Sequence, residues 1–183
     1  MVAPVIYLAR HATPDWSRTD IPYHTPPGPP LIEQGRAEAR ELGAYLAREG
    51  VQRIYASPLE RAQRTAELAG KVARASVEVV WAIREWQLQE GEEAVGQRMW
   101  GFWQQLVEES RQGGPVALVG HGGPIRVLLE RLGVEPERLS SYRTRFDGSN
   151  PLPPAGVWKV SQQGEGWSAT LDFIPGKAPA ETG

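Results

Sequence analysis

Residues 5–11 read VIYLARH, and residues 116–123 read VALVGHGG. Each stretch begins as an uninterrupted apolar run, which is typical of a strand buried on both faces of a sheet. Each run leads to a histidine, His11 in the first and His121 in the second, and the chain has only three histidines. Ligands of an open α/β sheet bind beyond the carboxyl ends of its strands. The two stretches therefore predict a sheet with a pair of imidazoles at its functional edge.

Two further strand-like runs carry polar residues to the same predicted edge. Residues 53–56 (RIYA) lead to Ser57 and Arg61, and residues 77–83 lead to Glu85. If the four strands are parallel neighbours, two imidazoles, two guanidinium groups and a carboxyl converge there. This set of side chains suits a phosphoryl group, whose oxygens carry negative charge and need fixed cations and donors around them.

Helical patterns alternate with these strands, which is the signature of βαβ units and a mainly parallel sheet. Ser57 and Glu60 have the spacing of a capping box, with Ser57 as the helix N-cap. A closing hairpin turns at residues 164–166. We expect one domain over residues 1–175, followed by a frayed tail over 176–183. The predicted helices span 33–48, 58–73, 94–110 and 124–132, the strands 4–9, 52–56, 77–82, 115–120, 157–161 and 167–173, and the loops 21–30 and 143–156.

The composition excludes several classes of protein. The 183 residues include no cysteine and carry a formal net charge of −2. The lack of cysteine excludes disulfides, thiolate metal sites and cysteine nucleophiles. The charge argues against nucleic-acid binding, and no apolar run approaches the ~20 residues of a membrane span. The first residues also lack the pattern of an export signal, so we expect a cytoplasmic protein without nucleic-acid or membrane partners.

Several catalytic motifs are missing from the sequence. Gly120-x-Gly122 continues to Ile125 instead of a third glycine, which breaks the dinucleotide fingerprint. The chain has no Walker P-loop, no G-x-S-x-G elbow and no H-E-x-x-H zinc motif. Nicotinamide redox, acyl transfer and zinc-dependent hydrolysis therefore lose support. We expect neither a metal nor another cofactor.

The residues at the predicted strand ends suit attack on phosphorus. His11 follows a rigid strand and supplies a nucleophilic imidazole nitrogen. Arg10 and Arg61 supply planar donors for phosphoryl oxygens, and His121 adds a hydrogen bond beside three glycines. Glu85 supplies a proton to the leaving oxygen if its pKa is raised. Four other glutamates lie between residues 78 and 93, and a solvated glutamate is the common case.

Three motifs resemble those of the histidine phosphatase superfamily, which is also called phosphoglycerate-mutase-like. The resemblance covers residues 5 to about 133 in the family's order and spacing. It implies a three-layer α/β/α sandwich without a metal cofactor, a phosphohistidine intermediate on His11 and an acid at Glu85. It also implies phosphate binding by Arg10, Arg61 and His121. The motifs are Arg10-His11-Ala12, Ser57-Pro58-Leu59-x-Arg61-Ala62-x-x-Thr65-Ala66 and Gly120-His121-Gly122-Gly123-x-Ile125-Arg126.

Some positions depart from the usual pattern of the family. Ser17 replaces an asparagine that often touches phosphate, and Pro14 replaces a threonine. Ser17 is either a phosphate-binding residue or a turn former. Residues 86–92 (WQLQEGE) reach the next helix quickly, so we expect no long substrate lid, which favours a bulky or protein-borne phosphate. His24, in the proline-rich loop 21–30, is expected to be solvated, with a loop that borders the pocket as the alternative.

The leading interpretation is a metal-independent phosphomonoesterase that acts on a small-molecule phosphate ester or a phosphoprotein. Two alternatives stay open: a phosphoglycerate-type mutase, and a non-catalytic phosphate-binding or interaction module. The mutase is disfavoured because glycolytic mutases are longer and enclose their substrate with extra segments. The pair Trp100 and Trp103 is more often core or interface than a cofactor-stacking site. The tryptophans leave room for a homodimer surface.

Overall fold

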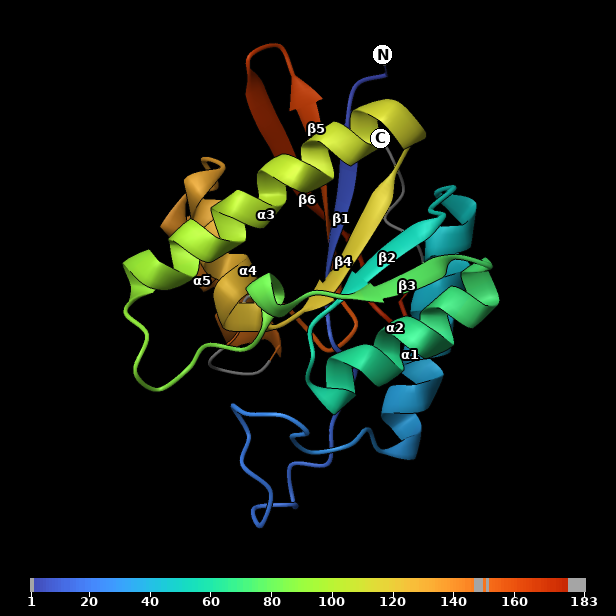
Figure 1. The fold of residues 1–183 in the computed structure, drawn as a ribbon, viewed down its shortest axis with the longest axis vertical. Helices are drawn as coiled ribbons and strands as arrows, with labels where there is room; N and C mark the ends of the chain where they lie inside the picture. Colours follow the sequence, from blue (N-terminus) through green and yellow to red (C-terminus); the bar gives the residue numbers. More distant parts are fainter. Residues whose placement is uncertain (1, 147–149, 151, 178–183) are drawn as a thin grey trace.

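Six β-strands form one sheet in the spatial order β3-β2-β4-β1-β5-β6 (Figure 1). β1 to β4 run parallel to one another, and β5 and β6 are antiparallel at one side, so the expected mainly parallel sheet is confirmed. This computed structural model describes residues 2–146, 150 and 152–177, and only the backbone of 142–146. The strands are β1 (Val5–Arg10), β2 (Arg53–Ala56), β3 (Ser76–Val79), β4 (Val116–Gly120), β5 (Val157–Gln163) and β6 (Gly166–Phe173).

Helices cover both faces of the sheet and complete the three layers that the family resemblance implied. α1 and α2 pack on one face, and α3, α4 and α5 pack on the other (Figure 1). Within the described ranges, no helix is both long enough and apolar enough to cross a bilayer. The helices are α1 (Glu33–Arg48), α2 (Glu60–Ala73), α3 (Glu92–Gly113), α4 (Gly122–Arg131) and α5 (Pro136–Phe146).

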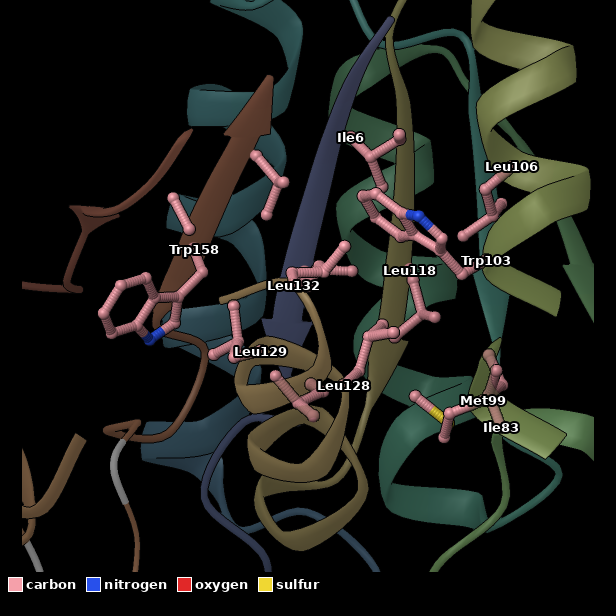
Figure 2. Packing of buried hydrophobic residues seen from close by; sticks show 14 of the residues in the cluster. Ile6, Ile83, Met99, Trp103, Leu106, Leu118, Leu128, Leu129, Leu132 and Trp158 are labelled. Carbon is pink, nitrogen blue, oxygen red and sulfur yellow. The ribbon is translucent and has the colours of Figure 1, made fainter. Parts of the chain in front are cut away.

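The strand residues alternate between two separate apolar cores. In β1, Ile6 and Leu8 join the core under α3 and α4, whereas Tyr7 and Ala9 join the core under α1 and α2. Figure 2 shows Trp103 of α3 packed among the side chains of the first core, and it is only 1% exposed. Each fully buried side chain of this size contributes about 1.5–3 kcal/mol relative to exposure. Packing on both faces therefore holds the strands rigidly, together with the residues that follow them.

Helices α1 and α2 approach each other closely because α1 carries a glycine at their contact. A Cβ atom added at Gly43 would lie 2.6 Å from the carbonyl oxygen of Ala69 in α2, a distance that real Cβ atoms do not adopt. The two backbones therefore touch at this position. This contact fixes the location of α2, whose first turn carries Arg61.

The capping box predicted from Ser57 and Glu60 is wrong. α2 begins at Glu60, its N-cap is Leu59, and no side chain caps the helix. The backbone N–H of Glu60 instead donates to the carbonyl oxygen of Pro27 in the loop before α1, at 2.8 Å. The expected strand 77–82 is also shorter, because β3 ends at Val79.

The expected loop 143–156 overlaps a helix that the sequence analysis did not predict. α5 ends at Phe146 and therefore includes the first residues of that range. The turn signal Asp147-Gly148 lies outside the described residues. Most of the expected tail, from residue 178 onward, also lies outside them. Just before it, the backbone N–H of Gly176 donates to the Glu41 carboxylate at 2.8 Å.

Candidate active site

His11 lies directly after β1, beside the end of β4. Its backbone N–H donates to the carbonyl oxygen of Gly120 at 2.9 Å, which continues the parallel pairing of the two strands. The side chain is 1% exposed. Its Nδ1 lies 2.8 Å from the carbonyl oxygen of Ala12. A carbonyl only accepts, so Nδ1 carries the proton and Nε2 presents a lone pair.

Buried hydrogen bonds fix the turn that follows His11. The backbone N–H of Ala12 donates to Oγ1 of Thr65 at 2.9 Å, and this hydroxyl donates to the carbonyl oxygen of Arg61 at 2.6 Å. The backbone N–H of Thr13 donates to the Glu38 carboxylate at 2.8 Å, and the Thr13 hydroxyl donates to the same group. The end of β1 is therefore tied to both α1 and α2.

Arg61 is fully buried and links the other charged and polar groups. Its Nε–H donates to Nε2 of His11 at 3.3 Å, and its Nη2 donates to Oε2 of Glu85 at 3.1 Å. Its Nη1 donates to the carbonyl oxygen of Tyr23 at 2.9 Å. The Tyr23 ring also lies against the guanidinium, with 3.9 Å between Cζ and the ring centroid. A planar guanidinium with five N–H donors can satisfy all of these partners at once.

His121 follows β4 and lies beside His11, with 5.3 Å between the ring centroids. Its Nδ1 is 3.2 Å from Oε2 of Glu85, and its Nε2 is 2.7 Å from the hydroxyl oxygen of Ser57. A carboxylate only accepts, so Nδ1–H donates to Glu85 and Nε2 accepts from Ser57. The hydroxyl predicted to cap α2 therefore orients this imidazole instead.

Burial and charge set the protonation of the cluster. Burial lowers the pKa of His11 well below its usual value, and Arg61 and Arg10 lower it further. Burial likewise lowers the pKa of His121, although Glu85 opposes the shift. Burial by itself would raise the pKa of Glu85, but His121 and Arg61 outweigh it and hold that pKa far below the usual value. Near neutral pH both imidazoles are neutral and Glu85 is ionised.

Two residues of the predicted cluster, Arg10 and Glu85, line a cavity of about 570 Å³. Arg10, which is 4% exposed, reaches this cavity and donates from Nη1 to the carbonyl oxygen of Leu152 at 2.8 Å. His24, expected to be solvated, is half-buried and forms part of the wall, where its Nδ1–H donates to the carbonyl oxygen of Trp86 at 3.0 Å. The cavity is lined by Arg10, Trp16, Tyr23, His24, Glu85, Gly123 and Asn150.

Asn150 is a cavity residue that the sequence analysis missed. Its amide packs directly on Gly122, where an added Cβ would lie 1.7 Å from Oδ1. Gly122 is thus required by close packing, as the glycine-rich motif allows. The contact joins positions far apart in the chain, and the only local signal for it is that glycine.

The structure does not bring Ser17 into this cluster. Ser17 is exposed, and its backbone N–H and hydroxyl both bond to the Asp15 carboxylate, at 3.1 and 2.5 Å. This is the arrangement of a turn former. Pro14 pairs with Leu31 as an isolated bridge across the same loop. Phosphate binding by Ser17 stays a prediction that this geometry does not support.

The described part of the chain contains no group of three or more His, Cys, Asp or Glu residues able to hold a metal ion. The cations of the cluster are guanidinium groups, and its donors are arginine and histidine N–H groups. Such donors bind anions that have several oxygens, and phosphoryl groups above all. The fold and the site together define an α/β protein with a buried cluster of arginine, histidine and glutamate side chains at the carboxyl end of its sheet.

Comparison with protein families confirms the resemblance. The model of the histidine phosphatase superfamily, branch 1, matches residues 6–93 and 87–170. The chain therefore belongs to this superfamily. A search of curated proteins found no significant match to the sequence.

Several solved structures share the fold. A mycobacterial glucosyl-3-phosphoglycerate phosphatase in complex with VO3 aligns with a TM-score of 0.74 and 21% identity, over 94% of this chain and 99% of that one. A phosphoglycerate mutase from Bacillus anthracis aligns with a TM-score of 0.72 and 20% identity, over 92% of each chain. A phosphoserine phosphatase variant from Entamoeba histolytica, in complex with phosphoserine, aligns with a TM-score of 0.69 and 16% identity, over 91% of this chain and 94% of that one.

Proposed function

We propose that this protein is a metal-independent phosphomonoesterase that forms a phosphohistidine on His11. One observation carries the proposal. Oε2 of Glu85 accepts hydrogen bonds from Arg61 at 3.1 Å and from His121 at 3.2 Å, so an anionic oxygen already occupies donors suited to a phosphoryl oxygen. The lone pair of His11 Nε2 lies against the same guanidinium, 3.3 Å from its Nε. A phosphoryl group held by these donors would face the nucleophile.

The first chemical step is attack on phosphorus by Nε2 of His11. The bond from Nε2 to phosphorus forms as the bond from phosphorus to the ester oxygen breaks. The ring is held by its Nδ1–H bond to Ala12, which favours the tautomer with an unprotonated Nε2. Arg10, Arg61 and His121 stabilise the negative charge on the phosphoryl oxygens, which is the electrostatic role that metal ions fill in other phosphoryl-transfer sites.

Glu85 supplies the proton that the leaving alkoxide needs. The carboxyl is ionised in the free site because His121 and Arg61 lower its pKa. A bound phosphate ester takes over these two partners and adds negative charge, and both effects raise that pKa. An ester that enters as the monoanion also brings a proton. Glu85 accepts this proton and passes it to the leaving oxygen.

Water completes the cycle by attacking the phosphohistidine. Glu85, deprotonated after the first step, accepts a proton from this water as the bond between phosphorus and Nε2 breaks. Inorganic phosphate then leaves, Nε2 regains its lone pair, and Glu85 releases its proton to solvent, which restores the free site. The substrate is a small-molecule phosphate ester or a phosphoprotein.

A phosphoglycerate-type mutase is the second candidate. In that reaction the phosphohistidine returns its phosphoryl group to a substrate hydroxyl instead of water. Chain length does not separate the two, because the phosphoglycerate mutase from Bacillus anthracis aligns over 92% of each chain. A non-catalytic phosphate-binding module is the third candidate. The buried lone pair on His11 favours an enzyme over it, because simple anion binding has no need of that nucleophile.

Hydrolysis of an aryl phosphate in the presence of EDTA tests the proposal. We expect turnover by the wild type and a loss of about a thousandfold or more in His11→Ala. Quenching of the wild type with alkaline denaturant during turnover should trap a protein-bound phosphate that acid then releases, and His11→Ala should lack it. Equal turnover in both proteins would exclude His11 as the nucleophile. Binding of phosphate without turnover of any ester would favour the binding module, and phosphoryl return to glycerate faster than phosphate release would favour the mutase.

A further inference from the structure

Glu85 is carried by a segment with almost no regular structure. Residues 84–90 follow the 3₁₀ turn Trp81–Ile83 and contain only one turn before α3 begins. Their backbone groups therefore find hydrogen-bond partners on side chains, and those partners decide the shape of the segment. Two charged side chains outside the cavity lining supply these bonds: Arg98 from α3, and Glu90 from the segment itself.

Arg98 binds the backbone at Glu85 and at two residues just before it. Its Nη1 donates to the carbonyl oxygens of Ala82 at 2.8 Å and Arg84 at 3.0 Å. Its Nη2 lies 3.4 Å from the carbonyl oxygen of Glu85 itself. One rigid guanidinium thus holds three carbonyl groups within four residues of chain, a pattern that the single ammonium of lysine cannot reproduce.

Glu90, near the end of the segment, forms an ion pair with the guanidinium of Arg98. Its carboxylate accepts from Nε and Nη2 of Arg98, both at 2.9 Å, in a bidentate pair. It also accepts from the backbone N–H of Gln87 at 2.9 Å and from the Arg84 side chain at 2.7 Å. The side chains of Arg98 and Glu90 are only 12% and 11% exposed, so water screens this pair little.

The backbone of the segment in turn orients the Glu85 carboxylate. Oε1 accepts from the backbone N–H of Trp86 at 2.9 Å, which leaves Oε2 facing Arg61 and His121. The Gln87 side chain also donates to the carbonyl oxygen of Glu85, at 2.8 Å. A shift of this backbone would therefore move the carboxylate relative to the phosphoryl donors.

We propose that Arg98 and Glu90 are positioning residues that hold Glu85 where it can protonate the leaving oxygen. The inference rests on the proposed function. It has a specific consequence, because only poor leaving groups need a proton at the moment of bond cleavage. Loss of the Arg98–Glu90 pair should slow hydrolysis of alkyl esters and spare esters of acidic phenols.

The test compares kcat/KM for glycerol 2-phosphate and 2,4-dinitrophenyl phosphate, because kcat/KM covers the steps through release of the alcohol. General acid catalysis is worth about 10²–10⁴-fold, so Arg98→Lys should lose about ten- to a hundredfold on the alkyl ester and less than about threefold on the aryl ester. Glu90→Gln should show the same selectivity. Arg111→Lys makes the same change at the far end of α3 and should leave both substrates unaffected.

Glu85→Gln and the double variant Glu85→Gln/Arg98→Lys complete the experiment. Glu85→Gln should lose activity selectively on the alkyl ester, and adding Arg98→Lys should cause no further loss, because the arginine acts through the carboxyl. Equal losses on both esters in Arg98→Lys and Glu90→Gln, or an additional loss in the double variant, would overturn the inference while the proposed function stands. If Glu85→Gln loses the same activity on both esters, then Glu85 is not the general acid, and this inference fails with it. Absence of turnover in the wild type would reject the proposed function.

Discussion

The two buried imidazoles lower the stability of the folded state by an amount that depends on pH. Burial lowers the pKa of both His11 and His121, and the nearby Arg61 and Arg10 also disfavour a positive charge on either ring. In the unfolded chain, histidine titrates near ~6.5. Below that pH the unfolded state binds protons that the folded state does not, so acid shifts the equilibrium toward unfolding. The burial that keeps His11 neutral thus weakens the fold in acid.

We therefore expect the free energy of unfolding to fall as the pH drops below ~6.5, by up to about 1.4 kcal/mol per pH unit for each of the two histidines. The decrease continues until the pH reaches their folded-state pKa values. Urea titrations between about pH 7.5 and 5.5 measure it. His11→Asn removes one of the two titrating groups, so its stability should depend less steeply on pH. Parallel curves for wild type and variant would contradict this assignment.

At the scale of elements, hydrogen bonds of the Thr65 hydroxyl connect α2 to the end of β1. Its Oγ1 accepts from the backbone N–H of Ala12 at 2.9 Å and donates to the carbonyl oxygen of Arg61 at 2.6 Å. Replacement by valine keeps the branched shape and leaves the Ala12 N–H without its partner. A buried donor without a partner costs about 1–3 kcal/mol. Thr65→Val should lose this amount of stability, and its turnover should fall because His11 and Arg61 are no longer held in register.

The matched control is Thr170→Val, the same substitution at an exposed position of β6. Surface changes of this kind stay within about 0.5 kcal/mol, so the two variants should separate clearly in urea denaturation. A Thr65→Val protein as stable and as active as the wild type would show that packing alone holds α2 against β1.

The ends of the buried strands are the part of this protein that the sequence predicts best. His11 and His121 close two apolar runs, and neighbouring parallel strands bring their carboxyl ends together. Arg61 lies in the first turn of the helix that follows β2, so the same rule places it near the cluster. Glu85 instead reaches the cluster from an irregular segment beyond the exposed strand β3. Short buried strands are specified by local apolar residues, so this part of the fold and site could be predicted without any long-range information.

Loop contacts could not be predicted in the same way. Ser57 has the spacing of a helix cap, but the ring nitrogen of His121 offers its hydroxyl a buried acceptor, and this tertiary contact prevails over the local one. His24 and Asn150 join the cavity through partners at Trp86 and Gly122, far along the chain. Neither contact leaves a periodic pattern in the sequence. The amino-acid pattern therefore predicts the cluster around His11 and His121 but not the contacts that form the walls around it.

At the scale of the whole molecule, two loops enclose one cavity at the carboxyl end of the sheet. The loop between β1 and α1 and the segment between β3 and α3 both lie at this end (Figure 1). They are joined across the cavity by the bond from His24 to the carbonyl oxygen of Trp86, at 3.0 Å, and by the bond from Gln87 to the carbonyl oxygen of His24, at 2.7 Å. Under the proposed function, Arg61 and His121 hold the phosphoryl group, and these loops lie where the alcohol part of the ester would bind. We therefore expect binding of phosphate and recognition of the alcohol to depend on different parts of the chain.

Trp16 tests this division because it lines the cavity and is 51% exposed. An aromatic contact is worth about 0.5–1.5 kcal/mol, so Trp16→Ala should raise KM for ring-bearing phosphate esters about two- to tenfold. Inhibition by inorganic phosphate should not change, because phosphate needs only the buried cluster. Trp81→Ala removes an exposed indole that does not line the cavity, and KM should not change in that variant. If Trp16→Ala instead weakens inhibition by inorganic phosphate as much as it raises KM, then the β1–α1 loop shapes the phosphoryl site itself and the two tasks are not separate.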